Sequence, residues 1–229
     1  MPAADDDLLR SLDVANEAAR SGNLATALGS WMTLEPQLRS AGLLEEATAV
    51  TQLVCNARDA IERAREEGNT CFKAKKWADA RKAYTRALDF CPSDASLLTN
   101  RAAAALRAGD ARAALVDAST AVAHNKEWVK GHFRRGQALV ALGDLSGAAA
   151  AHEEAARLGA GTDASKELSA AAKAARAAAD EEAKRTGGSK QPVAAKIGDE
   201  ATDEEQGLQQ QGPQQGPQQP TFDRTVQTP

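Results

Sequence analysis

Small apolar residues recur with a fixed period in the middle of the chain. When the segments that begin at Ile61, Ala95 and Val129 are aligned, like residues meet at a spacing of 34. The eighth, twentieth and twenty-seventh positions of every unit are small, and they are Gly68, Ala80, Ala87, Ala102, Ala114, Ala121, Gly136, Ala148 and Ala155. Small residues at fixed places let helices approach closely, and stacked units bury apolar faces that no single unit could bury alone. The pattern therefore predicts a stacked array.

Each unit also contains a polar break between its eighth and twentieth positions. The breaks are at Lys76, at Gly109–Asp110 and at Gly143–Asp144. Gly and Asp at such places favour turns, and Pro92 closes the first unit in the same way. We therefore expect every unit to be two helices joined by a short turn, with the three units at 61–94, 95–128 and 129–162.

Residues 1–60 are predicted to form an N-terminal helical region. Within it, Ala15, Ala27 and Trp31 stand at the offsets of a degenerate fourth unit that would begin near Leu8. Residues 42–60 do not fit the period, and we expect them to form an extra helix that leads into the first clear unit.

The chain changes character twice after the third unit. Residues 163–186 predict a helix of about 20 residues whose Ala and Leu side covers the last hairpin while its charges face water, so it is a capping helix. Residues 187–229 contain QQQGPQQGPQQP and almost no apolar residue to bury, which predicts a disordered tail rich in Gln, Pro and Gly. The tail is acidic, with three basic and six acidic residues.

The composition favours an all-α fold and excludes several classes of partner. With 42% hydrophobic but only 3% aromatic residues, the core suits helices packed on helices. The tail carries most of the formal net charge of −4, which leaves the body nearly neutral and argues against a nucleic-acid or membrane-surface partner. No run approaches the roughly 18 apolar residues needed to span a bilayer, and the start MPAADDDLLR is acidic, so we expect a cytoplasmic location.

No residue pattern points to catalysis, a metal or a cofactor. The three histidines fall on different elements without metal-ligand spacing, and the common nucleophile and phosphate-binding motifs are absent. Cys55, Cys71 and Cys91 also lack metal-type spacing and are expected to be small buried hydrophobes. We therefore expect a protein that is not an enzyme and that holds no metal and no cofactor.

Polar residues on the first helices of the units form one cluster when whole periods are subtracted. The cluster consists of Arg65, Asn69, Asn100, Lys130 and Arg134. Their reduced positions are three and four residues apart, which is one face of one helix, and that face lines the concave groove of a stacked array. Three cations and two amides suit a ligand with paired carboxylates, because charged donors neutralise a carboxylate and neutral donors fix its plane. An acidic peptide with a free C-terminus fits this description.

These residues make the chain resemble tetratricopeptide repeat proteins of the two-carboxylate-clamp co-chaperone type. The resemblance covers residues 61–162 and implies a right-handed superhelical array of antiparallel helix pairs. In that family, Lys and Asn of the first repeat, Asn of the second, and Lys and Arg of the third hold the acidic C-terminus, ending Glu-Glu-Val-Asp, of heat-shock protein 70 and 90 chaperones. Arg65 is the one departure: it keeps the charge of the usual Lys on a longer, planar group.

The resemblance implies a non-catalytic co-chaperone or adaptor whose ligands are the C-termini of heat-shock protein 70 or 90. His132 and Phe133 are candidates for a pocket that receives an apolar ligand side chain, with interior packing as the alternative. A second, unidentified protein partner would contact the N-terminal helices, including Trp31 and Met32, or the tail. The alternative function is a scaffold for protein-complex assembly, for example in cilia, whose groove binds an internal peptide and needs no free carboxylate.

Overall fold

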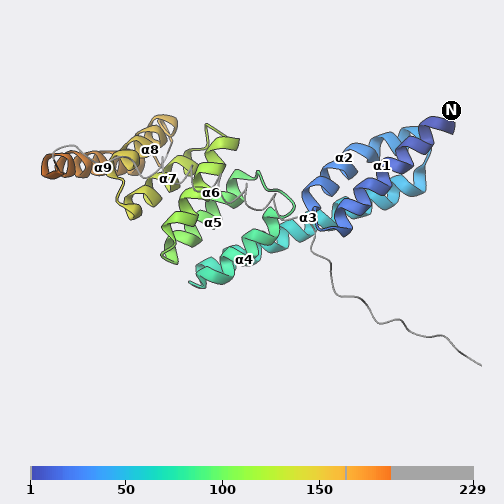
Figure 1. Ribbon diagram of the computed structural model, residues 1–229, viewed down its shortest axis with the longest axis horizontal. Coiled ribbons are helices and arrows are strands. Elements are labelled where there is room, and N and C mark those ends of the chain that lie inside the picture. The colour runs from blue at the N-terminus through green and yellow to red at the C-terminus, as the bar shows by residue number, and fades with distance from the viewer. Residues whose placement is uncertain (1, 163, 187–229) are drawn as a thin grey trace, which may run out of the picture. The chain divides into compact units, whose positions relative to one another are not determined.

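The computed structural model describes residues 2–162 and 164–186, and these residues form nine helices and no strand (Figure 1). The helices are α1 (Pro2–Arg20), α2 (Leu24–Ala41), α3 (Leu44–Lys73), α4 (Trp77–Leu88), α5 (Ala95–Arg107), α6 (Ala111–His124), α7 (Val129–Leu142), α8 (Leu145–Leu158) and α9 (Ser165–Thr186). The predicted all-α fold is confirmed. The tail predicted for residues 187–229 lies outside the described residues.

Each helix packs against the next helix along the chain, and α5 also packs against α7. The three predicted hairpins are formed by the second half of α3 with α4, by α5 with α6, and by α7 with α8. All nine small residues of the repeat pattern are buried. The period of 34 therefore marks the positions at which the backbones of neighbouring helices approach one another.

The eighth and twenty-fourth positions of a unit are matched in size. The pairs are Gly68–Tyr84, Ala102–Ala118 and Gly136–His152. A Cβ atom on Gly68 would lie 2.5 Å from Cε1 of Tyr84, and one on Gly136 would lie 2.6 Å from Cε1 of His152. Glycine thus leaves room for a ring in the first and third units, while the middle unit has alanine at both positions.

Aspartates begin the helices that follow three of the predicted turns. Asp94 accepts hydrogen bonds at 2.8 and 2.9 Å from two backbone N–H groups in the first turn of α5. Asp110 accepts one at 3.1 Å at the start of α6, and Asp144 accepts one at 2.8 Å at the start of α8. Each carboxylate satisfies N–H groups that the helix leaves without an internal partner, which fixes where the helix begins.

The turn inside each unit requires a left-handed backbone residue. Gly109 has φ of 85° and Gly143 has φ of 81°, as glycine readily adopts. Lys75 stands one period before Gly109 and has φ of 60°, although it carries a side chain. The first unit therefore makes the same turn as the others at a conformational cost.

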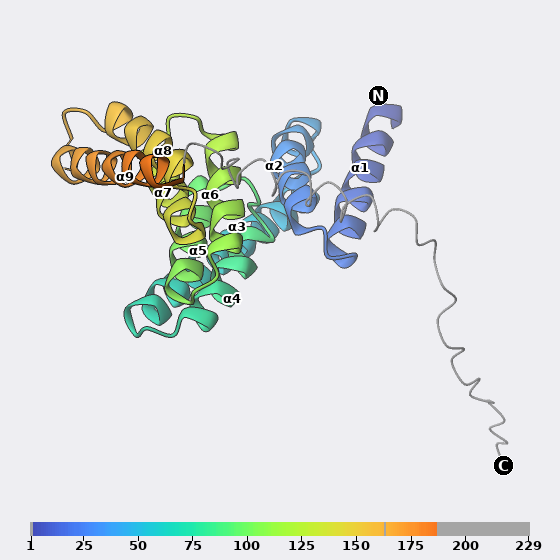
Figure 2. The same cartoon turned by 60° about the vertical axis from the view of Figure 1, so that its left-hand side comes forward.

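The extra helix expected at residues 42–60 continues directly into the first repeat. Helix α3 runs from Leu44 to Lys73, with its first half packed against α2 and its second half against α4 (Figure 2). The segment contains no proline, and its first glycine is Gly68, so nothing in it favours a break near residue 60.

Helices α1 and α2 form a helix pair that packs on the first half of α3. Ala15, Ala27 and Trp31, the residues at repeat-like offsets, are all buried there. The Trp31 indole Nε1 donates a hydrogen bond to Asn16 Oδ1 at 3.0 Å, which ties α2 to α1. Trp31 is thus a core residue and is not available as a contact for a second partner, whereas Met32 is exposed.

Helix α9 covers the last hairpin, as predicted for a capping helix. Its buried side chains are Leu168, Ala172, Ala175 and Ala179, and the helix packs against α8. Their spacing of three and four residues places them on one stripe of the helix. The apolar face of the third unit is therefore shielded from water at this end of the array.

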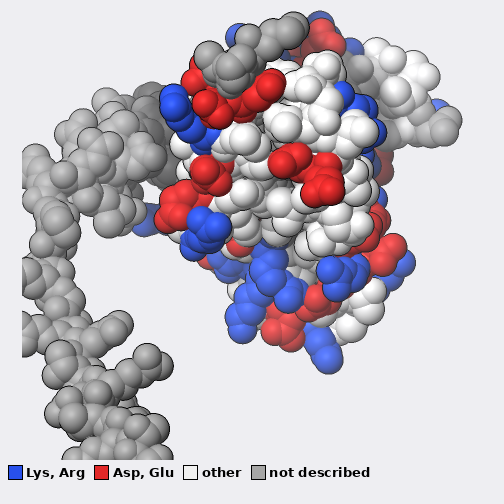
Figure 3. Space-filling view, turned by 90° about the vertical axis from the view of Figure 1, so that its right-hand side faces the viewer, with Lys and Arg blue, Asp and Glu red and all other residues white. Residues whose placement is uncertain are grey.

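The surface of the described residues mixes charges of both signs. Figure 3 shows Lys and Arg side chains interspersed with Asp and Glu around uncharged areas on one face. Most ion pairs join exposed side chains and contribute little to stability. The pair of Arg101 and Asp117 is better enclosed, because two bonds of 2.8 and 2.7 Å join α5 to α6 and the Asp117 side chain is only 9% exposed.

The cysteines differ from expectation. Cys55 is exposed, and Cys71 and Cys91 are half-buried, so the prediction of burial is wrong for Cys55. Cys55 lies on the solvent side of α3, on the same helix as the buried Val54 and Ala57.

In the described part of the chain, no helix is long and apolar enough to cross a membrane.

Candidate functional site

Three of the five residues in the predicted cluster line one hollow. Asn69 on α3, Asn100 on α5 and Arg134 on α7 border a cavity of about 200 Å³. The other lining residues are Phe72, Lys73, Tyr84 and Ala103. The lining therefore contains two cations, two amides and no acid, and its three polar residues from the cluster come from the first helix of each unit.

The Asn69 amide is held in place by a tyrosine. The Tyr84 hydroxyl donates a hydrogen bond to Asn69 Oδ1 at 2.8 Å. Burial raises the pKa of Tyr84, so its hydroxyl keeps the proton that it donates. Because Oδ1 is engaged, the Asn69 Nδ2 hydrogens remain to donate to a ligand. Asn100 is half-buried, and its side chain makes no hydrogen bond to another described residue.

Arg134 is a half-buried cation without an acidic partner within 4 Å among the described residues. Its Nη1 donates to Gln137 Oε1 at 2.7 Å, and its guanidinium carbon lies 5.8 Å from the centre of the Phe133 ring. Burial lowers the pKa of Arg134, and the nearby charge of Arg107 lowers it further, while Glu167 opposes both. An anion would relieve this cost of a partly desolvated charge, so the position favours a carboxylate.

Two lysines add positive charge near these groups. Lys73, at the end of α3, lines the hollow, and Lys130 is exposed on the first turn of α7. Within the described part of the chain, neither lysine forms an ion pair. Lys130 does not line the hollow itself, but it stands four residues before Arg134, one helical turn away on the same face.

Arg65 differs from the other predicted cations because it already has a partner. Its guanidinium forms bonds of 2.8 and 2.6 Å with the two carboxylate oxygens of Glu62, three residues earlier on α3. The hydrogen bond that Arg65 donates to the Glu62 carboxylate raises the pKa of Arg65. Arg65 does not line the hollow, and a ligand at this corner would compete with Glu62.

His132 and Phe133, the candidates for an apolar pocket, also lie outside the lining of the hollow. His132 is buried, and its Nε2 is 2.9 Å from the carbonyl oxygen of Lys126 in the turn before α7. The Phe133 ring packs at a tilt of 57° against His152 of α8, with 5.2 Å between the ring centres. In the hollow, the apolar lining is instead supplied by Phe72 and Ala103.

The chain is similar in sequence to known proteins over part of its length. No protein-family model matches the chain. DnaJ homolog subfamily C member 7 of Mus musculus is 35% identical over 103 residues, which are 45% of this chain and 21% of that protein. The Hsp70-Hsp90 organizing protein of Triticum aestivum is 34% identical over 93 residues, which are 41% of this chain and 16% of that protein. The chain thus matches only about a fifth of the length of these relatives, or less.

A solved structure shares the arrangement of helices. The Sgt2 TPR domain from Aspergillus fumigatus is 28% identical, with a TM-score of 0.51, and the similarity covers 56% of this chain and 83% of that domain. The arrangement of helices is that of a tetratricopeptide repeat domain. The hollow lined by Asn69, Asn100 and Arg134 lies on the surface formed by the first helices of the repeats, and this surface is called the groove below.

Several residues of this tetratricopeptide groove are missing from the cluster predicted from sequence. They are Phe72, Lys73, Tyr84 and Arg107. Lys73 and Arg107 are one period of 34 apart, at the ends of the first helices of two successive repeats, so the repeat register contained a signal for both. Tyr84 lies on a second helix, and only the packing of that helix against α3 brings its hydroxyl to Asn69.

Proposed function

We propose that this tetratricopeptide repeat protein is a non-catalytic cytoplasmic adaptor that binds the acidic C-terminus, ending Glu-Glu-Val-Asp, of heat-shock protein 70 or 90. The observation that carries the proposal is the hollow in which Asn69, Asn100 and Arg134 converge from three repeats. Helices carry these side chains, so little backbone entropy is lost when a ligand binds.

The chemistry of the groove fits two neighbouring carboxylates. A carboxylate accepts up to about four hydrogen bonds, and the amides of Asn69 and Asn100 with the charges of Lys130 and Arg134 supply donors of both kinds. The terminal carboxylate and the side chain of a final Asp would share these donors. Lys73 provides a further cation beside the hollow for an acidic residue upstream in the peptide.

The relatives support the same function. The Hsp70-Hsp90 organizing protein carries the two chaperones in its name, and its similarity to this chain over 93 residues is close to the length of three repeats. A DnaJ homolog is similar over 103 residues. A second partner remains part of the proposal, because an adaptor must bring another protein to the chaperone through surfaces outside the groove.

Titration calorimetry of an acidic peptide ending Glu-Glu-Val-Asp tests the proposal. We expect a Kd in the micromolar range, about −8 kcal/mol, and no binding of the same peptide with an amidated C-terminus. Lys130→Ala should weaken binding by about tenfold or more, as expected for the loss of a charge-assisted hydrogen bond. Lys82→Ala on α4 removes an equal charge from an exposed position that does not line the hollow and should leave binding unchanged.

The same titration also distinguishes the proposed function from the alternative one. Binding of the amidated peptide with the affinity of the free acid would mean that the groove holds an internal peptide, as in a scaffold for complex assembly. Binding that Lys82→Ala weakens as much as Lys130→Ala would mean that net charge attracts the peptide without a defined site.

A further inference from the structure

The first turn of the capping helix lies beside the first turn of α7. Leu168 of α9 is buried against Gly159, where a Cβ atom would overlap the Leu168 side chain. The same Cβ position is 3.4 Å from Cγ1 of Val129, the first residue of α7. Gly159 thus allows α9 to start next to the helix that carries Lys130 and Arg134.

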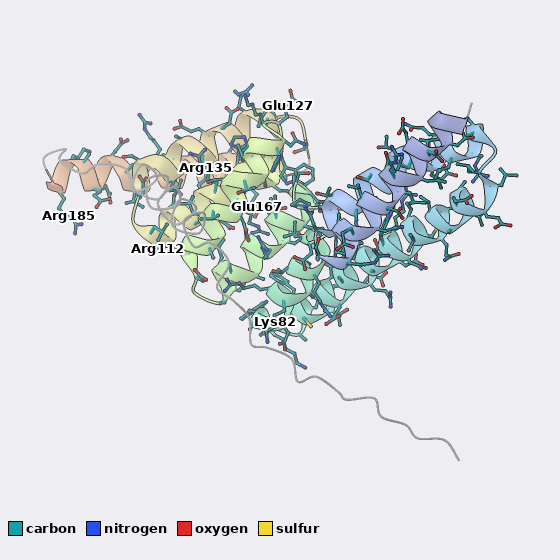
Figure 4. All side chains as sticks on the ribbon, turned by 45° about the vertical axis from the view of Figure 1, so that its right-hand side comes forward. Lys82, Arg112, Glu127, Arg135, Glu167 and Arg185 are labelled. Carbon is teal, nitrogen blue, oxygen red and sulfur yellow. The ribbon has the colours of Figure 1, made fainter. Side chains whose placement is uncertain are left out.

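Glu167 precedes Leu168 and is exposed on this turn. Figure 4 labels it far from Arg185, which lies at the other end of α9. Burial and the charge of Arg107 lower the pKa of Arg134, whereas the charge of Glu167 raises it. The carboxylate makes no ion pair within 4 Å in the described residues, so it influences Arg134 as a charge at longer range.

We propose that Glu167 is an affinity-setting residue of the groove, which weakens the binding of carboxylate ligands at Arg134 and Lys130. This inference rests on the proposed function. A carboxylate of the ligand that approaches Arg134 must share the cation with Glu167 and is repelled by it. The interaction crosses solvent-exposed space, so it is modest in size and sensitive to salt.

A structural role for Glu167 predicts a different outcome. An acidic residue in the first turn of a helix interacts favourably with the helix dipole, so Glu167 also stabilises α9. Its neutralisation would then lower the unfolding temperature slightly without changing ligand affinity. The salt dependence of ligand affinity therefore distinguishes an electrostatic role at the groove from a role in the helix alone.

The test is peptide titration with wild type, Glu167→Gln and Glu153→Gln. The control Glu153→Gln makes the same charge change on α8, where Glu153 is 3.7 Å from Arg176 of α9. At about 50 mM salt we expect Glu167→Gln to bind the Glu-Glu-Val-Asp peptide about two- to fivefold more tightly, the range of one surface charge pair. Glu153→Gln should match the wild type, and the gain should vanish near 1 M salt.

Equal affinity of wild type and Glu167→Gln, or an equal gain in Glu153→Gln, would overturn the inference while leaving the proposed function intact. If the wild type does not bind the peptide, the proposed function fails. Glu167 is then tested with sodium sulfate, a simple dianion, by following the side-chain NMR signal of Arg134. Tighter sulfate binding in Glu167→Gln supports the inference, and identical titrations overturn it.

Discussion

Gly68→Ala is expected to destabilise the protein although it replaces a helical glycine by the best helix former. The new Cβ would lie 2.5, 2.7 and 2.9 Å from three carbons of the Tyr84 ring, all too close for contact. The ring is buried, and its hydroxyl is bonded to Asn69, so it cannot move without losing packing or that bond. Overpacking costs about 1 to 3 kcal/mol, and the helix preference of alanine recovers about 1 kcal/mol.

The net loss for Gly68→Ala is therefore up to about 2 kcal/mol, which urea unfolding followed by circular dichroism can measure. Gly29→Ala in α2 is the matched control, because a Cβ there meets nothing within 4 Å and should stabilise by about 0.5 to 1 kcal/mol. The reasoning is refuted if both variants are equally stabilised. Equal stabilisation would mean that the Tyr84 ring moves freely.

The Tyr84 ring contributes to stability by packing against Gly68, and its hydroxyl contributes to ligand binding by orienting Asn69. Tyr84→Phe separates these two contributions. Phenylalanine keeps the ring against Gly68 but removes the donor to Asn69. The loss of stability should be limited to about 0.5 to 1.5 kcal/mol, the worth of one hydrogen bond. Peptide affinity should fall because the Asn69 amide is no longer oriented. Unchanged affinity in Tyr84→Phe would show that the hydroxyl has no positioning role.

Two further predictions concern stability. Lys75→Gly should raise the free energy of unfolding by up to about 1 kcal/mol, because it relieves a left-handed conformation at φ of 60° and matches Gly109 and Gly143; a lower urea midpoint would contradict it. Burial lowers the pKa of His152, so the unfolded chain takes up its proton first as the pH falls. Stability should therefore decline below about pH 6.5 and be unaffected above it, and His152→Tyr should remove this part of the decline in thermal unfolding.

The repeats could be predicted from sequence because their signals are local and periodic. Small residues, turn residues and the capping stripe of α9 all depend on spacing along one segment. The residue at which the first repeat begins was harder to predict from sequence. The period suggested a boundary near residue 60, but a helix ends only where a residue or a tertiary contact stops it, and α3 contains no such residue before Gly68.

The groove was only partly predictable for a different reason. Subtracting whole periods placed Asn69, Asn100 and Arg134 on one face, and they line one hollow. The same arithmetic cannot show that Arg65 is engaged by Glu62, because that depends on the conformation of two long side chains. Contacts between the two helices of a repeat, such as that of Tyr84 with Asn69, also lie outside a comparison of equivalent positions.

The first and third repeats use the same packing position to support a residue of the groove. In the first, Gly68 admits the Tyr84 ring, and the Tyr84 hydroxyl orients Asn69. In the third, Gly136 admits the His152 ring, which packs against Phe133 next to Arg134.

In two of the three units, a ring packed between the two helices of the repeat thus contacts a groove residue, Asn69, or the neighbour of one, Phe133. Each of these rings needs a glycine on the facing helix. The small residues of the repeat pattern therefore allow the helices to pack closely, and they also leave room for the rings that support residues of the groove. The middle unit pairs Ala102 with Ala118 and has no ring there, and its Asn100 makes no hydrogen bond to another described side chain. We conclude that Asn69 is held by the buried Tyr84, and Arg134 by Gln137 and the Phe133 ring of its own helix. Asn100 is free to adjust to the ligand.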